Sequence, residues 1–565
     1  MSDVSETRGI LASSAVMASG TVFSRASGYL RNVLLAAAIG NELHADLFNI
    51  GNTIPNMLYI LLAGGVFNAV LVPQLVRAQK NDPDRGDAYT NRIITLAVLF
   101  LGAVTILLVI AAPLVMRLFL NSSFDDPALA AQRDSAIAFA RYCLPQVFFY
   151  GMFALLGQVL NARGRFGPMM WAPIANNVIA IAVLVLYLVW FGPLSPSDQC
   201  AAFSRTQELV LGLGATIGIV AQVAVLLPYL KAVGVRFRPR YDFRHSGLGH
   251  TLRLGVWTVL FVVVNQVAFT VVVRLASGGT ASSVCLPDHS QHAQAASDAT
   301  GYTVYSGAFL FVMVPHAIIT VSLATAILPR LSAKAADRDL SGLAATLAGT
   351  LRTALVVVIP FAFALPLFAY DAAKVMFGYG ATSTTYSHFV ASMILFGPGL
   401  VFFTVHYLML RGFYALELNR TVFYIQCVIG ATNIVVAVLL VQYATAAQTS
   451  PALVLAYGAS YLIGSVISYA VLSRRLGGLQ TNGLVRFLVR LFVAAVVAAA
   501  VTYYIGQALP GSGDDVTHLE AAFRLVVLGA VDVALFLALA QLLRIREVTT
   551  VLETVFRRIP RRGSF

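Results

Sequence analysis

The chain has 565 residues, of which 58% are hydrophobic and 11% charged, and its formal net charge is +13. This composition excludes an ordinary soluble domain, in which about a quarter of the residues are charged, and predicts an all-α polytopic membrane protein. The positive charge does not indicate nucleic-acid binding, because an excess of arginine in short loops is what orients helices in a bilayer. We therefore expect no nucleic acid among the partners.

About fourteen segments are long and apolar enough to span a bilayer, since a spanning helix takes roughly 20 mostly apolar residues. Several exceed this minimum, which indicates tilted or kinked helices. The segments lie near residues 9–39, 46–77, 91–120, 134–162, 168–191, 208–230, 247–277, 300–329, 342–369, 386–416, 420–445, 451–473, 485–509 and 519–543.

The connections between these segments alternate in charge along the chain. Because basic loops stay in the cytoplasm, the alternation predicts that both termini are cytoplasmic, as an even number of spans requires. The basic connections contain Arg77, Lys80, Arg85 and Arg92, then Arg163 and Arg165, then Lys231, Arg236, Arg238, Arg240 and Arg244, then Arg330, Lys334 and Arg338, then Arg420, then Arg474, Arg475 and Arg486, and the tail. The acidic ones contain Glu42, Asp125, Asp126, Asp198, Asp288, Asp298, Asp371, Asp514 and Asp515.

The first span carries polar side chains where a spanning helix is otherwise apolar. On a helix Ser24, Gly28 and Arg31 share one face, and Arg25 and Asn32 form the adjoining stripe. Gly28 is also a place where the helix can bend. An arginine at bilayer depth costs several kcal/mol, roughly 2.5–3.5 on insertion scales, unless it faces water, a partner or a ligand. The stripe is therefore expected to line a site.

The second span carries a similar polar face. Asn49, Asn52 and Asn56 share one side of it, and Pro55 frees backbone groups that neighbouring side chains must satisfy. Two facing polar stripes of cationic character predict a cavity for a multiply charged anion.

Arg25 and Arg31 are the expected ligands of that anion, because the guanidinium fork is planar and permanently charged and suits phosphate. Asp46, near the outer end of the second span, is expected to form a gating pair with one of them when the site is empty. The alternative is that both arginines pair with Asp46 or with helix carbonyls and only hold the helices together.

Other polar groups inside the spans are weaker candidates for the cavity, with interhelical hydrogen bonds or interfacial snorkelling as alternative roles. Asp532 lies alone in the last span, and Arg490 on the preceding span is its expected partner. The weaker candidates are Arg141, Asn265, Gln266, His316 and Arg411.

The chain contains four cysteines. Cys143 and Cys427 fall inside spans, where a small buried apolar residue is the usual role. Cys200 and Cys285 fall in two loops assigned to the outside, and we predict that they form a disulfide. No Cys-x-x-Cys pair or His/Cys cluster indicates a metal site.

Several motifs follow one another in order over almost the whole chain. They are S-R-A-S-G-Y-L-R-N at 24–32, D-L-F-N-I-G-N-T-I-P-N at 46–56, L-N-A-R-G-R-F-G-P-M-M-W-A-P-I-A-N-N at 160–177, I-L-P-R-L-S at 327–332, F-G-Y-G at 377–380 and R-G-F-Y-A-L at 411–416. This set resembles the MviN/MurJ family of lipid II flippases, in the multidrug/oligosaccharidyl-lipid/polysaccharide exporter superfamily.

The resemblance implies two six-helix lobes around a central cationic cavity, at residues 1–235 and 236–478. It also implies a lipid-tail groove formed by two further helices at 479–545, followed by a basic cytoplasmic tail at 546–565. Ser24, Arg25, Arg31, Asp46 and Asn56 are carried over as residues that contact the diphosphate or support those that do.

The chain also departs from the family pattern, in a way that resembles the actinobacterial branch. Tyr59 stands where many members have an arginine, and Gly64 where they have a glutamate. Leu310 and Met313 replace an arginine and a glutamate of the eighth helix, and Asn32 replaces an acidic residue. The cavity is thus expected to hold fewer charges than usual.

The function that the resemblance implies is transport. The chain would carry an undecaprenyl-diphosphate-linked peptidoglycan precursor outward across the bacterial cytoplasmic membrane by alternating access. It would need no cofactor and would be driven by the membrane potential, protons or sodium ions. Its partners would be the lipid-linked anion, membrane lipids and the machinery of cell-wall synthesis or division. The alternatives are an exporter of another lipid-linked oligosaccharide, a drug or cation exporter of the same superfamily, and a membrane glycosyltransferase or polymerase.

Overall fold

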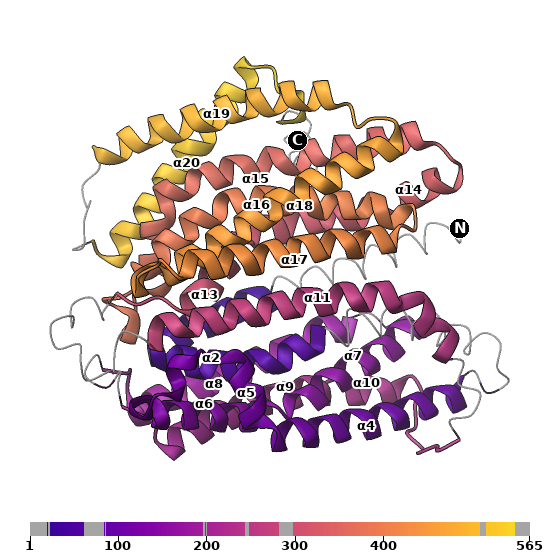
Figure 1. The fold of residues 1–565 in the computed structure, drawn as a ribbon, viewed down its shortest axis with the longest axis vertical. Coiled ribbons are helices and arrows are strands. Elements are labelled where there is room, and N and C mark those ends of the chain that lie inside the picture. Colours follow the sequence, from indigo (N-terminus) through magenta and orange to yellow (C-terminus); the bar gives the residue numbers. More distant parts are fainter. Residues whose placement is uncertain are drawn as a thin grey trace, which may run out of the picture. The chain divides into compact units, whose positions relative to one another are not determined.

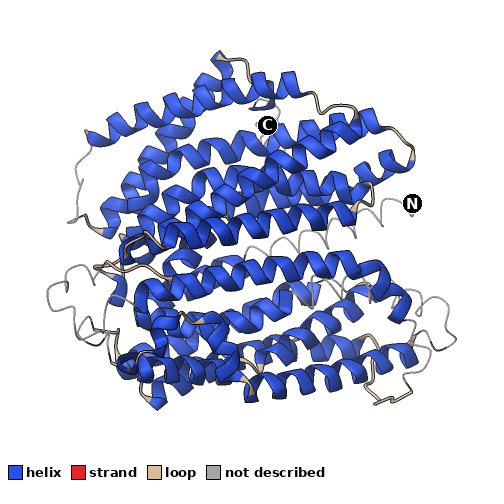
Figure 2. Ribbon diagram, in the orientation of Figure 1, coloured by secondary structure: helices blue, strands red, loops and turns tan. Residues whose placement is uncertain are grey.

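The computed structural model describes residues 20, 23–60, 84, 86–165, 167–195, 198, 201–242, 248–281, 298–508 and 516–548, with side chains omitted at 248–255. All regular structure within these ranges is helical, which confirms the all-α fold class (Figure 2). Twelve helices in the described part of the chain are long and apolar enough to cross a membrane. They correspond to the third to fourteenth predicted spans. The first two predicted spans lie partly outside the described residues, so the total of fourteen and the orientation stay predictions.

The chain forms two compact units. The first comprises Met1–Thr303 with Tyr379–Ser383, and the second comprises Val304–Gly378 with Thr384–Phe565. The boundary of the first unit falls within α13 (Tyr302–Val312), whereas the predicted boundary between the lobes lies at residue 235. The difference concerns α11 (Leu248–Ala281), which packs against α2 (Leu43–Tyr59) and α5 (Ala112–Phe119). Lobes defined by movement need not coincide with packing units, so the predicted lobes stay a prediction.

The first unit is a set of helices (Figure 1), and proline marks the junction between consecutive helices at two points. Pro113 stands in the first turn of α5, directly after α4, and Pro145 stands between α6 and α7. Proline has no N–H to donate and cannot sit inside a regular helix without breaking a bond, so each marks a joint. Besides a helix over residues 23–39, the remaining helices are α4 (Asp87–Ile110), α6 (Ala130–Cys143), α7 (Gln146–Ala162), α8 (Gly167–Phe191), α9 (Arg205–Ala224) and α10 (Leu226–Ala232), with short 3-10 turns η2 (Ser122–Asp125) and η3 (Pro127–Leu129).

The second unit is organised around α16, which packs against both α15 and α18. α17 lies on α18, and the last two helices, α19 and α20, lie on α15. After α13 come the π-helical turn η5 (His316–Thr320), α14 (Val321–Ala336), α15 (Leu340–Phe377), the 3-10 turn η6 (Gly380–Thr382), which belongs to the first unit, α16 (His388–Ala415), α17 (Asn419–Val441), the 3-10 turn η7 (Ala446–Gln448), α18 (Thr449–Leu476), α19 (Thr481–Gln507) and α20 (His518–Leu542).

Several helices begin at capping sequences that satisfy their first N–H groups. Ser204 and Thr517 each form a capping box, with a glutamine or a glutamate three residues later. Asp339 accepts the Gly342 N–H at 2.8 Å at the start of α15. This bond, with a second from the Ser341 hydroxyl, lowers the pKa of Asp339 below its ordinary value.

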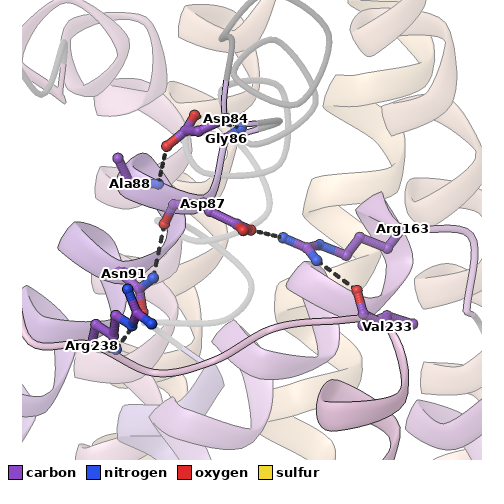
Figure 3. Close-up of polar contacts among 8 residues, drawn as sticks. All are labelled: Asp84, Gly86, Asp87, Ala88, Asn91, Arg163, Val233 and Arg238. Carbon is purple, nitrogen blue, oxygen red and sulfur yellow. Dashed lines mark hydrogen bonds and ion pairs between the residues drawn. The ribbon is translucent and has the colours of Figure 1, made fainter.

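Three of the predicted basic connections of the first unit meet at one end of its helices (Figure 3). Arg163, after α7, pairs with Asp87 at the start of α4 at 2.6 Å, and its Nη1 donates to the Val233 carbonyl at 2.8 Å. The Arg238 N–H donates to Asn91 Oδ1 at 2.8 Å. Loops that the charge pattern assigns to one side of the membrane therefore lie together.

The segment after α10 is held along α4 by further bonds. Arg240 N–H donates to Thr95 Oγ1 at 3.0 Å, and Arg92 forms an ion pair with Asp242. The hydrogen bond from Arg92 lowers the pKa of the exposed Asp242 carboxyl below its ordinary value. Which face of the membrane this end occupies stays a prediction.

The last two helices are tied to α15 by polar contacts inside the second unit. Arg524 on α20 pairs with the buried Asp371 on α15 at 3.2 Å. Asp532 accepts a hydrogen bond from Thr502 on α19 at 3.4 Å. The expected partner Arg490 does not take this role, because the hydroxyl of Thr502, twelve residues further along the same helix, reaches the carboxylate. The predicted lipid-tail groove itself stays a prediction.

Close helix packing at a glycine gives a direct test of the first unit. An added Cβ at Gly212 on α9 would lie 2.7 Å from the Cβ of Tyr142 on α6, whereas one at Gly102 on α4 would meet nothing within 4 Å. We expect Gly212→Ala to destabilise the protein by about 1–3 kcal/mol through overpacking. Gly102→Ala should be neutral or stabilise by at most about 1 kcal/mol. Thermal unfolding of both variants in detergent measures the contrast, and equal midpoints would contradict this packing.

Candidate functional site

Some residues of the polar stripe on the first helix pack against α8, whereas others are accessible to solvent. Asn177 on α8 donates through Nδ2 to the Ser24 carbonyl and to Ser27 Oγ, each at 2.9 Å. An added Cβ at Gly28 would lie 3.4 Å from Asn177 Nδ2. Ser24 and Gly28 therefore belong to the contact between this helix and α8. Asn177 was not predicted as a site residue from the sequence, although it is the last residue of the motif at 160–177.

The two arginines of the stripe form no ion pair within the described part of the chain. Arg25 is exposed, and Arg31 is half-buried with Nη2 3.4 Å from Asn32 Oδ1. None of the ion pairs within the described residues includes either arginine. Neither arginine therefore forms an ion pair with Asp46 or another acid in the described part of the chain, and their role as ligands of an anion stays a prediction.

A pair of tyrosines lies next to Arg31. Tyr150 on α7 is an electrostatic neighbour of Arg31. Tyr59, at the end of α2, packs against Tyr150 with ring centroids 5.0 Å apart. Tyr59, which stands where the resemblance leads us to expect an arginine, thus contributes a ring and a hydroxyl beside Tyr150.

The polar face of α2 makes several interhelical contacts. Asn52 Oδ1 accepts from Gln146 Nε2 on α7 at 3.0 Å, and Asn49 Nδ2 donates to Thr303 Oγ1 at 2.9 Å. Asn56 is exposed. Pro55 is buried inside α2, which runs on to Tyr59. Of the predicted substrate contacts on α2, Asn52 is engaged by a neighbour, whereas Asn56 is open.

Asp46 is completely buried and accepts three hydrogen bonds. They come from Thr280 Oγ1 at 2.8 Å, Tyr302 N–H at 3.0 Å and Thr303 N–H at 2.7 Å. The two N–H groups open α13, so the carboxylate occupies the positive end of that helix. An added Cβ at Gly301 would collide with the carboxylate, which explains the glycine there.

The prediction that Asp46 forms a gating pair with an arginine is not realised in this conformation. Its partners are a hydroxyl and backbone amides, which lie more than 230 residues further along the chain. The sequence around Asp46 does not indicate such a partner. The one indication is that α13 follows Gly301, which has no side chain to cap the helix.

The weaker candidates occupy different places. Gln266 on α11 donates to the Met57 carbonyl at 3.1 Å and so contacts α2 within the first unit. Asn265 and Arg141 are both exposed, on α11 and α6. His316 and Arg411 belong to the second unit, where the aromatic ring of Tyr407 contacts both.

Three further predictions concern cysteines, metals and the replaced charges. Cys200, Cys285 and Gly64 lie outside the described residues, and Cys143 and Cys427 are free thiols. The described part of the chain contains no group of three metal-ligating side chains. Leu310 is 56% exposed on α13, and Met313 just beyond it is buried.

Comparison with known proteins decides the family. A family model described as lipid II flippase MurJ matches residues 35–523. The chain belongs to the lipid II flippase MurJ family. Like other MurJ proteins, it is a multi-pass protein of the inner membrane.

Individual MurJ relatives match over most of their length. The probable lipid II flippase MurJ of Rhizobium tropici is 24% identical over 523 residues, which cover 92% of each chain. That of Vibrio cholerae serotype O1 is 26% identical over 433 residues, 74% of this chain and 75% of the relative.

Solved structures extend the likeness to the fold. A lipid II flippase MurJ in an inward closed conformation superposes with a TM-score of 0.68 at 16% identity, covering 96% of this chain and all of that one. An inward-facing MATE family transporter of the MOP superfamily gives a TM-score of 0.60 at 14% identity, covering 82% of this chain and 96% of the other.

The Asp46 contacts predict how the start of α13 responds to mutation. Asp46→Ala would leave the buried donors of Thr280, Tyr302 and Thr303 without their acceptor, at a cost of about 2 kcal/mol or more. We expect faster hydrogen exchange at the amides of Tyr302 and Thr303, measured by mass spectrometry in detergent, while α17 exchanges as before. Asp46→Asn, which keeps one acceptor oxygen, should fall between. Unchanged protection at 302–303 in the alanine variant would refute the capping role.

Proposed function

We propose that the chain flips lipid II from the inner to the outer leaflet of the bacterial cytoplasmic membrane, for peptidoglycan synthesis, by alternating access. The family match over residues 35–523 carries this proposal. The structure adds that the cations of the first helix, Arg25 and Arg31, have no acidic partner within the described residues.

The physical problem that such a protein solves is desolvation. Moving an isolated ion from water into hydrocarbon costs on the order of tens of kcal/mol, so a lipid diphosphate does not cross unaided. Arginine side chains replace part of the lost hydration with charge-assisted hydrogen bonds. The prenyl tail can stay in lipid while units of the protein expose the site to each side in turn.

Arg31 is better prepared for this role than Arg25. Its side chain is half-buried and flanked by Tyr150, so its charge acts in a medium of lower dielectric than water. Arg25, which is exposed, can meet the diphosphate first without a desolvation cost of its own. Asn56, also exposed on α2, can add a neutral hydrogen bond.

The other functions considered from the sequence are less favoured. A drug or cation exporter needs an accessible acid in its cavity, but Asp46 is buried and already accepts three hydrogen bonds. A glycosyltransferase would need catalytic carboxylates, and family membership argues for a flippase instead. Transport of another lipid-linked oligosaccharide would use the same diphosphate chemistry, so a comparison of cargoes separates it.

We also propose that a gradient, rather than a bound cofactor, drives transport. The membrane potential, protons and sodium ions each remain candidates, and collapsing them one at a time in proteoliposomes distinguishes them. Contact with the machinery of cell-wall synthesis or division is a further proposal, which a pull-down of the full chain tests.

Single-arginine variants test the proposed site. Removing one charge-assisted hydrogen bond costs about 1.5–3 kcal/mol, and each 1.4 kcal/mol is a factor of ten. We therefore expect Arg25→Ala and Arg31→Ala to slow lipid II flipping in proteoliposomes by roughly 10- to 150-fold, with normal membrane insertion. Arg165→Ala, at an exposed position in a basic turn, is the matched control and should flip at the wild-type rate.

Depletion of the protein in cells gives an independent measurement. Lipid II should accumulate in the inner leaflet, and the Arg25→Ala variant should fail to relieve the accumulation. Flipping at the wild-type rate by both arginine variants would contradict the assignment of the site. Accumulation of a different lipid-linked precursor would show that the transported lipid is not lipid II.

A further inference from the structure

The second unit holds an arginine in an unusual setting. Arg411 lies on α16, half-buried, with its guanidinium carbon 4.4 Å from the centre of the Tyr407 ring and 6.0 Å from that of Tyr414. Its Nη2 donates to the Tyr407 hydroxyl. Both tyrosines come from the same helix, one turn on either side, so the guanidinium is fixed in orientation.

No acidic group among the described residues forms an ion pair with Arg411. Its Nε is buried and has no hydrogen-bond partner in the described part of the chain. A buried donor left unpaired costs about 1–3 kcal/mol, and more in a charged group. Such a cost is expected where a side chain is kept ready for a ligand.

The groups around Arg411 do not supply a negative charge. The Tyr407 ring packs edge-on against His316, with centroids 5.0 Å apart. His316 Nδ1 is hydrogen-bonded to Thr404 Oγ1 at 2.9 Å, and Phe403 covers its ring at 4.6 Å. His316 also opens the π-helical turn η5, a distortion that is frequent at functional sites.

We propose that Arg411 binds an anionic group of the transported lipid, a phosphate or a carboxylate, from within the second unit. The inference rests on the proposed function and names a substrate contact beyond the first-helix arginines. Tyr407 holds the guanidinium plane and accepts from Nη2, whereas Nε has no partner among the described residues, so the guanidinium has donor capacity for an incoming oxygen. A fixed fork loses little side-chain entropy when an oxyanion binds.

Lipid II offers two sources of this chemistry. One is the diphosphate, which every undecaprenyl-diphosphate lipid carries, and the other is the set of carboxylates on the stem peptide. A lipid that has the diphosphate without sugar or peptide separates them, because only the first source is then present.

The chain provides a matched control for Arg411. Arg420, at the start of α17, lies against Tyr424 in the same way, with its guanidinium carbon 5.6 Å from the ring centre and Nη2 3.2 Å from the hydroxyl. Arg420 is exposed, however, and does not adjoin the π-helical turn. Substitution there changes charge and stacking equally without touching the proposed site.

The test measures binding of lipid II and of undecaprenyl diphosphate to the full-length purified protein in nanodiscs. We expect Arg411→Gln to weaken lipid II binding at least tenfold and Arg420→Gln to change it less than twofold. An equal loss for both ligands assigns the contact to the diphosphate, and a loss for lipid II alone assigns it to a carboxylate. Wild-type affinity of Arg411→Gln for both ligands would overturn the inference.

Two further measurements keep the outcome decisive. Arg411→Lys retains the charge but not the fork, so it should bind with intermediate affinity at an unchanged unfolding temperature, which separates ligand binding from a purely structural role. If the wild-type protein binds neither ligand, the proposed function fails. If it binds and Arg411→Gln binds equally well, only the present inference fails.

Discussion

A polar group within the bilayer must find its partner inside the protein, because hydrocarbon offers neither hydrogen bonds nor counter-ions. Asp46 shows what full satisfaction requires. Its carboxylate is completely buried and accepts from Thr280, Tyr302 and Thr303, which lie on two segments distant in the chain. The bonds join α2 to the end of α11 and the start of α13, so that a single charge organises one end of the first unit. This close approach requires a glycine at position 301, because an added Cβ there would collide with the carboxylate.

The arginines behave in the opposite way, and the contrast is informative. Among the described residues, Arg25, Arg31 and Arg411 have tyrosine, asparagine or solvent beside them and form no ion pair with an acid. The same chain pairs Arg163 with Asp87 and Arg524 with Asp371, so acidic partners are used where a cation is structural. The absence of an acidic partner among the described residues thus agrees with the proposal that these arginines bind an external anion. Aromatic neighbours hold such a cation in place without neutralising it.

Composition and hydropathy were sufficient to predict the helical spans, because every turn of a spanning helix must be apolar and the signal is local. The alternation of basic loops likewise predicted that the segments around Arg163 and Arg238 lie together. The hydrogen-bond partners of the polar side chains could not be predicted from the sequence. Asp46 was expected to meet an arginine and meets backbone amides instead, and Asp532 meets Thr502 rather than Arg490. Both depend on how helices far apart in sequence are rotated against each other, which periodicity within one helix does not encode.

The departure at position 59 alters the balance of the site in the first unit. Tyr59 packs on Tyr150, which is itself a neighbour of Arg31, and supplies a ring and a hydroxyl where the resemblance leads us to expect a third cation. A hydroxyl can donate one hydrogen bond to a phosphate, but it does not contribute a net charge against the two or more negative charges of a diphosphate. In the proposed site Arg25 and Arg31 are then the residues that supply positive charge. A further cation that contacts the lipid would offset the missing one, and Arg411, which has no acidic partner among the described residues, is the residue proposed for this role.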